Sequence, residues 1–233
     1  MTLDQGPPVL LVHGFASSAE HNWRHPGWLD LLADCGRETI AIDLPGHGTA
    51  PKPANPANPA GYKKVEAHVA AAVEGREPVD AIGFSAGAHV LLRLAADQPG
   101  TFRRLALLGI GRGVLEPADP EPIVAALTGE PDPENVTGMV FRRLADGLGN
   151  DRDALIAFLR RPQRPLTQAD LARITAHVLV VLGDQDPAGT LTPGDGLVAA
   201  LPDARLVTLR GVDHFGTPGD VRCMQAVLGF LGC

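Results

Sequence analysis

The chain has 233 residues, of which 45 % are hydrophobic, and a formal net charge of −7. This length and composition predict one folded domain with a well-buried core and exclude an intrinsically disordered chain. Lysine and arginine form no block along the sequence, so neither a nucleic acid nor an anionic membrane is expected as a partner.

Six short apolar runs predict β-strands, because each is almost continuously hydrophobic, as expected of strands covered on both faces. They are Val9–His13, Thr39–Asp43, Ala81–Phe84, Leu105–Ile110, Val178–Leu182 and Leu206–Leu209. Helical segments alternate with them, at Trp28–Cys35, Lys63–Glu74, Ala86–Asp97, Ala169–Thr175, Gly194–Ala200 and Asp220–Leu231. This alternation predicts an α/β fold with a doubly wound, mostly parallel sheet of about six strands.

One region breaks the alternation. The Pro-rich and acidic stretch RGVLEPADPEP is followed by three helical patterns, near Ile123–Leu127, Val136–Leu148 and Asp153–Arg161, with no convincing strand. We expect residues 112–165 to form a small helical cap over the carboxyl edge of the sheet. Residues 1–111 and 166–233 are then expected to form the core.

The sequence GFSAG at residues 83–87 follows a predicted strand and precedes a predicted helix. In this setting a G-x-S-x-G pattern holds a nucleophilic serine on a sharp turn. Gly83 and Gly87 would let the strand and the helix approach closely, and the turn would hold Ser85 in a strained conformation. We therefore interpret Ser85 as a nucleophile rather than as a packed core serine.

A serine nucleophile needs a base, and the base needs an orienting acid. Two later strands end in candidates, because VLVVLGDQD carries Asp184 and Asp186 and LVTLRGVDH carries Asp213 and His214. His214 is the preferred base because it lies on a separate late loop. Asp186 is preferred as the acid because it lies farther past its strand than Asp184, and Asp213, adjacent to the base, would point away from it.

The remaining histidines near these motifs have simpler interpretations. His13 is expected to fix the loop after the first strand, His47 to be structural, and His89 to be a satisfied polar residue under the site. His21 and His25 share a loop but lack a third ligand, so no metal site is expected.

The segment HGFASS at residues 13–18 supplies the remaining part of the predicted site. Gly14 has no side chain to fill the space at the end of the first strand. The backbone N–H of Phe15 could therefore join that of Ala86 in an oxyanion hole.

With these residues assembled, the sequence resembles the α/β-hydrolase superfamily, and in particular its single-domain serine esterase-like branch. The motifs that carry the resemblance span nearly the whole chain: HGF at 13–15, DLPGHG at 43–48, GFSAG at 83–87, GDQD at 183–186 and DHF at 213–215. The resemblance implies Ser85 as nucleophile, Asp186 as acid and His214 as base. It also implies the Phe15 and Ala86 amides as oxyanion donors, and no cofactor.

The sequence departs from that family in one respect. Family members usually carry an antiparallel hairpin before the strand that ends in HG, and only about a dozen residues precede His13 here. We therefore expect a sheet of six parallel strands without this hairpin. Its absence would leave Thr39–Asp43 as an edge strand, which could serve a homodimer.

No apolar run reaches the roughly 18 residues of a membrane helix, and MTLDQGPPVLLVHG lacks the features of a signal peptide. The cysteines Cys35, Cys223 and Cys233 are widely spaced and form no CxxC pair. Reduced thiols in a cytoplasmic protein are the simplest interpretation.

These features predict a serine hydrolase that cleaves the carboxylic ester of a small, apolar molecule through an acyl-enzyme on Ser85. A thioesterase, a lactonase, an aminopeptidase, a carbon–carbon-bond hydrolase or a low-turnover ligand receptor stays open, because fold and triad do not select the substrate. The candidate substrate-binding residues, with Phe15, are Trp23, Ile110, Val114, Leu115, Met139 and Phe215.

Overall fold

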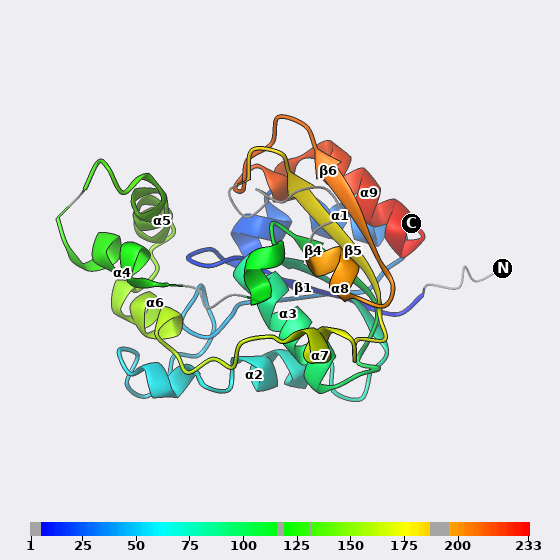
Figure 1. The fold of residues 1–233 in the computed structure, drawn as a ribbon, viewed down its shortest axis with the longest axis horizontal. Coiled ribbons are helices and arrows are strands. Elements are labelled where there is room, and N and C mark those ends of the chain that lie inside the picture. The colour runs from blue at the N-terminus through cyan, green and yellow to red at the C-terminus, as the bar shows by residue number, and fades with distance from the viewer. Residues whose placement is uncertain (1–5, 116–118, 131, 187–195) are drawn as a thin grey trace.

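The structure is a computed structural model and describes residues 6–115, 119–130, 132–186 and 196–233. Its centre is one sheet of six strands, all parallel, in the order β2-β1-β3-β4-β5-β6 (Figure 1). The strands are β1 (Val9–Val12), β2 (Thr39–Ile42), β3 (Val79–Phe84), β4 (Phe102–Leu108), β5 (His177–Gly183) and β6 (Ala204–Leu209). The predicted number and direction of the strands are confirmed, and β2 is an edge strand as expected.

Several strands begin earlier than their apolar runs, because charged side chains near their starts find partners. Asp80 in β3 is completely buried and accepts hydrogen bonds from Arg37 at 2.5 Å and Arg103 at 2.6 Å. A buried carboxylate is tolerated when it is paired in this way. The sheet therefore includes polar positions that a search for hydrophobic runs leaves out.

The alternation of side chains along each strand divides the core into two layers. In β1, Val9 and Leu11 join one buried cluster, whereas Leu10 and Val12 join the other. Both faces of the strand are apolar because helices cover both, as Figure 1 shows. This explains why the strands read as continuous hydrophobic runs.

Two helices, α1 (Trp28–Asp34) and α9 (Val221–Leu231), cover one face of the sheet. Four helices cover the other face: α2 (Val65–Ala71), α3 (Ala86–Asp97), α7 (Gln168–Leu171) and α8 (Leu197–Ala200). The helix expected at Gly194–Ala200 has its first two residues outside the described ranges. Shorter helical turns occur at Glu20–Arg24, Pro59–Tyr62, Arg112–Leu115 and Thr217–Gly219.

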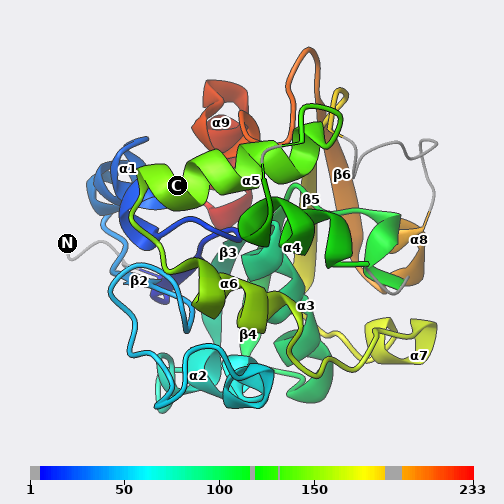
Figure 2. The same cartoon turned by 90° about the vertical axis from the view of Figure 1, so that its left-hand side faces the viewer.

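Three further helices follow β4: α4 (Glu121–Thr128), α5 (Val136–Gly147) and α6 (Arg152–Leu159). They lie together beside one side of the sheet in Figure 1 and stand in front of it in Figure 2. The division of the chain into a core and a cap of residues 112–165 stays a prediction. Within the described ranges, no helix has the length and apolar composition needed to cross a bilayer.

Candidate active site

Ser85 lies on the sharp turn between β3 and α3. Its backbone has φ 51° and ψ −114°, a conformation that L-residues rarely adopt. The flanking glycines permit this turn, because a Cβ atom on Gly87 would lie 2.2 Å from the carbonyl oxygen of Val12 and one on Gly83 would lie 2.8 Å from the backbone of Ala88. The expected close approach of strand and helix around Ser85 is confirmed.

The side chains of Ser85, His214 and Asp186 form one hydrogen-bonded row. His214 Nε2 lies 3.0 Å from Ser85 Oγ, and His214 Nδ1 lies 2.8 Å from Asp186 Oδ2. Because the carboxylate can only accept, Nδ1 carries a proton and Nε2 is free to accept from the hydroxyl. Asp186 is 2 % exposed, so water competes little for its hydrogen bond with His214.

The two other carboxylates near these loops are engaged by backbone. Asp184 accepts a 2.7 Å hydrogen bond from the N–H of Gly211, and Asp213 accepts one of 2.7 Å from the N–H of Gly216. Both therefore stabilise the turn that carries His214, and Asp186 is the acid that reaches the imidazole, as the sequence favoured.

The imidazole ring of His214 is packed on several sides. Its centroid lies 4.9 Å from that of Phe84 and 5.2 Å from that of Phe215. A Cβ atom on Gly109 would lie 3.2 Å from His214 Cε1, so a small residue below the ring leaves it room. This packing orients the ring between the hydroxyl and the carboxylate.

His13 holds the loop that follows β1. It is completely buried; its Nδ1 donates to the carbonyl of Gly14 at 2.7 Å, and its Nε2 accepts from the N–H of Leu44 at 2.9 Å. These two bonds fix a neutral tautomer, and burial lowers the pKa of His13 below its ordinary value. The amide oxygen of Asn22 accepts from the N–H of Gly14 at 2.9 Å. His13 thus has the structural role expected of it.

The predicted oxyanion donors lie on segments that adjoin Ser85. Phe15 follows Gly14 in the loop held by His13, and Ala86 is the first residue of α3. The first amides of a helix have no partner within it and are oriented toward negative charge at its N-terminus. Their action as an oxyanion hole stays a prediction.

A cavity of about 340 Å³ opens beside Ser85 and His214. Most of its wall is apolar, because it is formed by Phe15, Phe84, Val140, Phe141, Leu144 and Phe215. The polar part of the wall comes from Ser17, His21, Asn22 and Arg143. Of the residues predicted to bind substrate, Phe15 and Phe215 line this cavity.

The other predicted lining residues lie elsewhere. Trp23 is completely buried and packs edge to face on Trp28, with ring centroids 5.9 Å apart, because the turn at Glu20–Arg24 directs it into the core. Ile110 is in the buried core, and Leu115 packs against that core.

Met139 and Val114, which were also expected to bind substrate, do not line the cavity beside Ser85. α5 presents Val140, Phe141 and Leu144 to the cavity, and Met139 is not part of that wall. Apolar residues at i, i+1 and i+4 of the predicted helix were the signal that could have identified this face. Val114 lines a second and larger cleft, of about 670 Å³, beside α3.

Three further histidines, His89, His21 and His25, were expected to have simple roles. His89 is exposed to the larger cleft rather than enclosed under the site. His21 lines the smaller cavity, and its ring centroid lies 6.3 Å from that of His25. In the part of the chain that the structure describes, no three His, Cys, Asp or Glu side chains are grouped to hold a metal ion.

Comparison with known proteins gives relatives of this chain. A deacetylase of Xenorhabdus hominickii, pyrrolizixenacetamide deacetylase, is 33 % identical over 109 residues, which are 45 % of this chain and only 38 % of that enzyme. The pimeloyl-acyl-carrier-protein methyl ester esterase of Neisseria meningitidis is 28 % identical over 233 residues, with 88 % of this chain and 70 % of the esterase covered.

A solved structure shows the same fold. The 2-hydroxy-6-oxo-6-phenylhexa-2,4-dienoate hydrolase from Rhodococcus sp. strain RHA1 superposes with a TM-score of 0.74 at 23 % identity, covering 98 % of this chain and 92 % of that one. The family model described as alpha/beta hydrolase family matches residues 9–221. The protein therefore belongs to the alpha/beta hydrolase family.

Proposed function

We propose that the protein is a serine hydrolase that cleaves carboxylic esters of small, largely apolar molecules. The observation that carries the proposal is the row of hydrogen bonds from Ser85 Oγ to His214 Nε2, at 3.0 Å, and from His214 Nδ1 to Asp186 Oδ2, at 2.8 Å. Such a row combines a nucleophile, a general base and the acid that orients the base.

In the proposed reaction, Ser85 Oγ attacks the ester carbonyl carbon while His214 Nε2 takes the hydroxyl proton. The negative charge that develops on the carbonyl oxygen is held by the N–H groups of Phe15 and Ala86. His214 then gives the proton to the leaving alcohol as the carbon–oxygen bond breaks. Water, activated by His214, attacks the acyl-enzyme and releases the acid, while Asp186 stays ionised throughout.

The cavity beside Ser85 supports the proposed substrate class. Its volume of about 340 Å³ lies at the small end of the range of ligand pockets. Aromatic rings dominate its wall, so burial of an apolar acyl or alcohol group contributes to binding. Two of the compared relatives are named as a methyl ester esterase and a deacetylase, which also favours the hydrolysis of a carboxylic acid derivative.

A panel of p-nitrophenyl esters of increasing acyl length, run beside thioester and aminoacyl substrates, tests the proposal. We expect hydrolysis of short to medium acyl esters, and covalent capture of the wild type by a fluorophosphonate. Both should be lost in Ser85→Ala. The matched control is Ser18→Ala, because Ser18 accepts from the N–H of His21 at 3.2 Å and is not part of the cavity wall.

Two results would contradict the proposal. If folded Ser85→Ala is labelled as fast as the wild type, another residue is the nucleophile. If Ser85 of the folded wild type is inert to the fluorophosphonate, the protein is a ligand receptor on a hydrolase fold.

A further inference from the structure

The larger cleft, of about 670 Å³, lies between α3 and the residues that follow α6. Among the described residues it shares none with the wall of the cavity beside Ser85. The buried rings of Phe158 and Phe15, stacked with centroids 6.1 Å apart, lie between the two. A molecule in this cleft is therefore not in contact with Ser85, and any role of the cleft is separate from the proposed reaction.

The cleft differs in charge from the rest of the molecule. Its described wall contains five guanidinium or ammonium groups and three carboxylates, although the whole chain has a net charge of −7. An excess of positive charge in a hollow of an acidic protein favours an anionic ligand. Which of these groups could bind one depends on whether it already has a partner.

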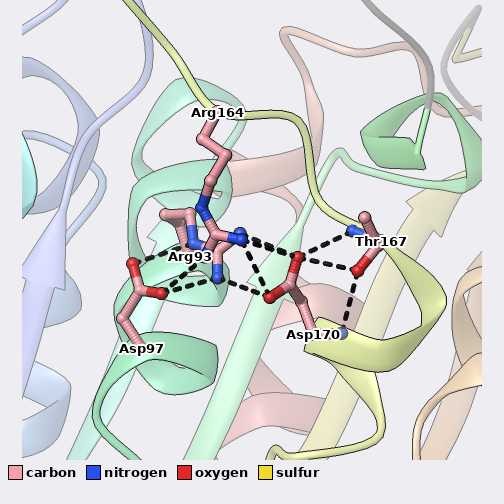
Figure 3. A network of polar contacts seen from close by, with 5 residues as sticks. All are labelled: Arg93, Asp97, Arg164, Thr167 and Asp170. Atoms are coloured by element: carbon pink, nitrogen blue, oxygen red, sulfur yellow. Dashed lines mark hydrogen bonds and ion pairs between the residues drawn. The ribbon is translucent and has the colours of Figure 1, made fainter.

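Two of the arginines are neutralised by a shared network. Figure 3 shows Arg93 and Arg164 bridged by the same two carboxylates. Arg93 lies 2.7 Å from Asp97 and 3.1 Å from Asp170. Arg164 lies 2.8 Å from Asp97 and 3.2 Å from Asp170. Two cations and two anions therefore balance in this network.

Two further cations of the cleft are offset by acids. The guanidinium of Arg160 makes two hydrogen bonds to the carboxylate of Glu121, at 2.9 and 2.7 Å. Such a bidentate pair occupies the edge of the guanidinium that would otherwise bind a ligand. Lys63 and Glu66 both line the cleft, and their opposite charges offset each other.

Arg161 is the exception. It is only 9 % exposed, yet none of the described carboxylates lies within 4 Å of it. Its Nη1 donates to the carbonyl of Phe158 at 2.8 Å, and its Cζ lies 3.9 Å from the centre of the same ring. Its Nε and Nη2 make no hydrogen bond with a described residue and are not sealed from solvent, so they are open to the cleft.

The burial of Arg161 without a counter-ion is unfavourable for the native state. Desolvation lowers the pKa of Arg161 to about 10, and the charge of Glu66 opposes this shift only in part. Arg161 is therefore still protonated at pH 7. A buried charge that the protein itself does not neutralise is a common feature of binding sites, because a ligand of opposite charge removes the unfavourable term.

The rest of the wall indicates which anion fits. The volume of about 670 Å³ is within the range of pockets that bind small organic molecules. Val90, Val114 and Leu166 line the cleft and are buried, so they offer an apolar surface. Arg161 supplies a single unpaired positive charge, which matches one carboxylate better than a doubly charged phosphate.

We infer that the larger cleft is a binding site for a small organic monocarboxylate, separate from the site around Ser85. The guanidinium of Arg161, held on the Phe158 ring, presents its free N–H groups to the carboxylate oxygens. The apolar part of the ligand packs on Val90, Val114 and Leu166. This inference goes beyond the proposed ester hydrolysis and does not depend on it.

Titration calorimetry with hexanoate tests the inference, with hexanamide as the uncharged ligand of the same length. We expect the wild type to bind hexanoate roughly tenfold or more tightly than hexanamide, because charge-assisted hydrogen bonds to Arg161 are made only by the carboxylate. In Arg161→Gln this preference should fall to about twofold or less. In the control Arg160→Gln, which removes a guanidinium already paired with Glu121, it should stay within about threefold of the wild type.

The inference is overturned if the wild type does not prefer hexanoate, or if Arg161→Gln, shown to be folded by circular dichroism, keeps the wild-type preference. Arg161→Lys gives a second test that disturbs packing less. It keeps the positive charge but not the planar pair of donors, so its preference should be intermediate between those of the wild type and Arg161→Gln. A preference in Arg161→Lys below that in Arg161→Gln also contradicts the inference.

Leu144→Trp separates the two sites, because Leu144 lines the cavity beside Ser85 and not the larger cleft. The larger side chain fills part of that cavity, so hexanoate should bind this variant as tightly as the wild type. Loss of hexanoate binding in folded Leu144→Trp would place the ligand beside Ser85 and overturn the separate site. Tighter binding of inorganic phosphate than of hexanoate to the wild type overturns the choice of a carboxylate.

Discussion

The side-chain amide of Asn150 donates from Nδ2 to the backbone carbonyl of Ala16 at 3.0 Å. Asn150 lies between α5 and α6, whereas Ala16 lies in the loop after β1 and has a positive φ of 57°. The amide oxygen of Asn150 also accepts from the N–H of Gly48 at 2.9 Å. One residue of the helical segment therefore ties together the loop after β1 and the loop after β2.

Asn150→Ala should lower kcat/KM for p-nitrophenyl esters roughly tenfold or more, because a small shift of the loop that carries Phe15 misplaces a predicted oxyanion donor. Asn150→Asp is the informative partner variant. It keeps the acceptor for Gly48 but has no donor for Ala16, so it should lose as much activity as Asn150→Ala. Full activity in Asn150→Asp would show that the bond to Ala16 is not needed.

Asp186→Asn should reduce kcat by about 10⁴, because an amide no longer fixes the imidazole tautomer that accepts the proton of Ser85. Asp184→Asn is the control: its carboxylate accepts only from the N–H of Gly211 among the described contacts, so activity should change by no more than a few-fold. Steady-state kinetics on one ester compares the two. Equal losses would mean that the assignment of the acid is wrong.

Gly87→Ala should prevent folding or strongly destabilise the chain, because its Cβ atom would lie 2.2 Å from the carbonyl of Val12. Gly229→Ala, in the last turn of α9, meets nothing within 4 Å. This second change should raise the free energy of unfolding by about 0.5–1 kcal/mol, since alanine is the better helix former. Denaturant titration measures both, and a stable Gly87→Ala would show that strand and helix can separate.

Asp170 should make the stability of the fold depend on pH. Hydrogen bonds from Arg93 and Thr167 lower the pKa of Asp170 below its value of about 4 in an unfolded chain. The stabilising contribution is therefore complete above about pH 4–5 and is lost as the pH falls through the lower, folded-state pKa.

Asp170→Asn tests this dependence, because asparagine does not titrate. At pH 7 the variant should unfold at a lower denaturant concentration than the wild type. The difference between the two should shrink as the pH is lowered from 5 to 2. A difference that stays constant over this range would contradict the role assigned to the carboxylate.

We predict self-association from the position of β2 at the edge of the sheet. Among the described residues no strand pairs with its outer edge, and proteins usually cover or pair such an edge. We expect a homodimer through this edge or the face beside it, to be measured by light scattering across a range of concentrations. A strictly monomeric mass would contradict this prediction.

The fold was predictable because its signals are local. Continuous apolar runs mark strands covered on both faces, and the helices α4, α5 and α6 occur where Ile123–Leu127, Val136–Leu148 and Asp153–Arg161 had been predicted. The strand starts were less clear, because Asp80 is buried only by virtue of Arg37 and Arg103, which come from distant parts of the sequence.

The meeting of Ser85, Asp186 and His214 was also predictable, because each follows the carboxyl end of a parallel strand and these ends share one edge. The wall of the cavity was not. Whether Val140 or Met139 faces the cavity depends on the rotation of α5 about its axis, which its neighbours decide. The burial of Arg161 likewise depends on the Phe158 ring and on α3, which no local pattern reveals.

The backbone at Ser85 has a consequence for engineering. A residue other than glycine at φ 51° strains the backbone and lowers the free energy of unfolding. The proposed nucleophile is therefore also a position that destabilises the native state. Ser85→Gly would relieve this strain and give a more heat-resistant but inert molecule. Laboratory evolution that rewards thermal resistance alone would therefore favour loss of the nucleophile, and a screen for turnover has to accompany it.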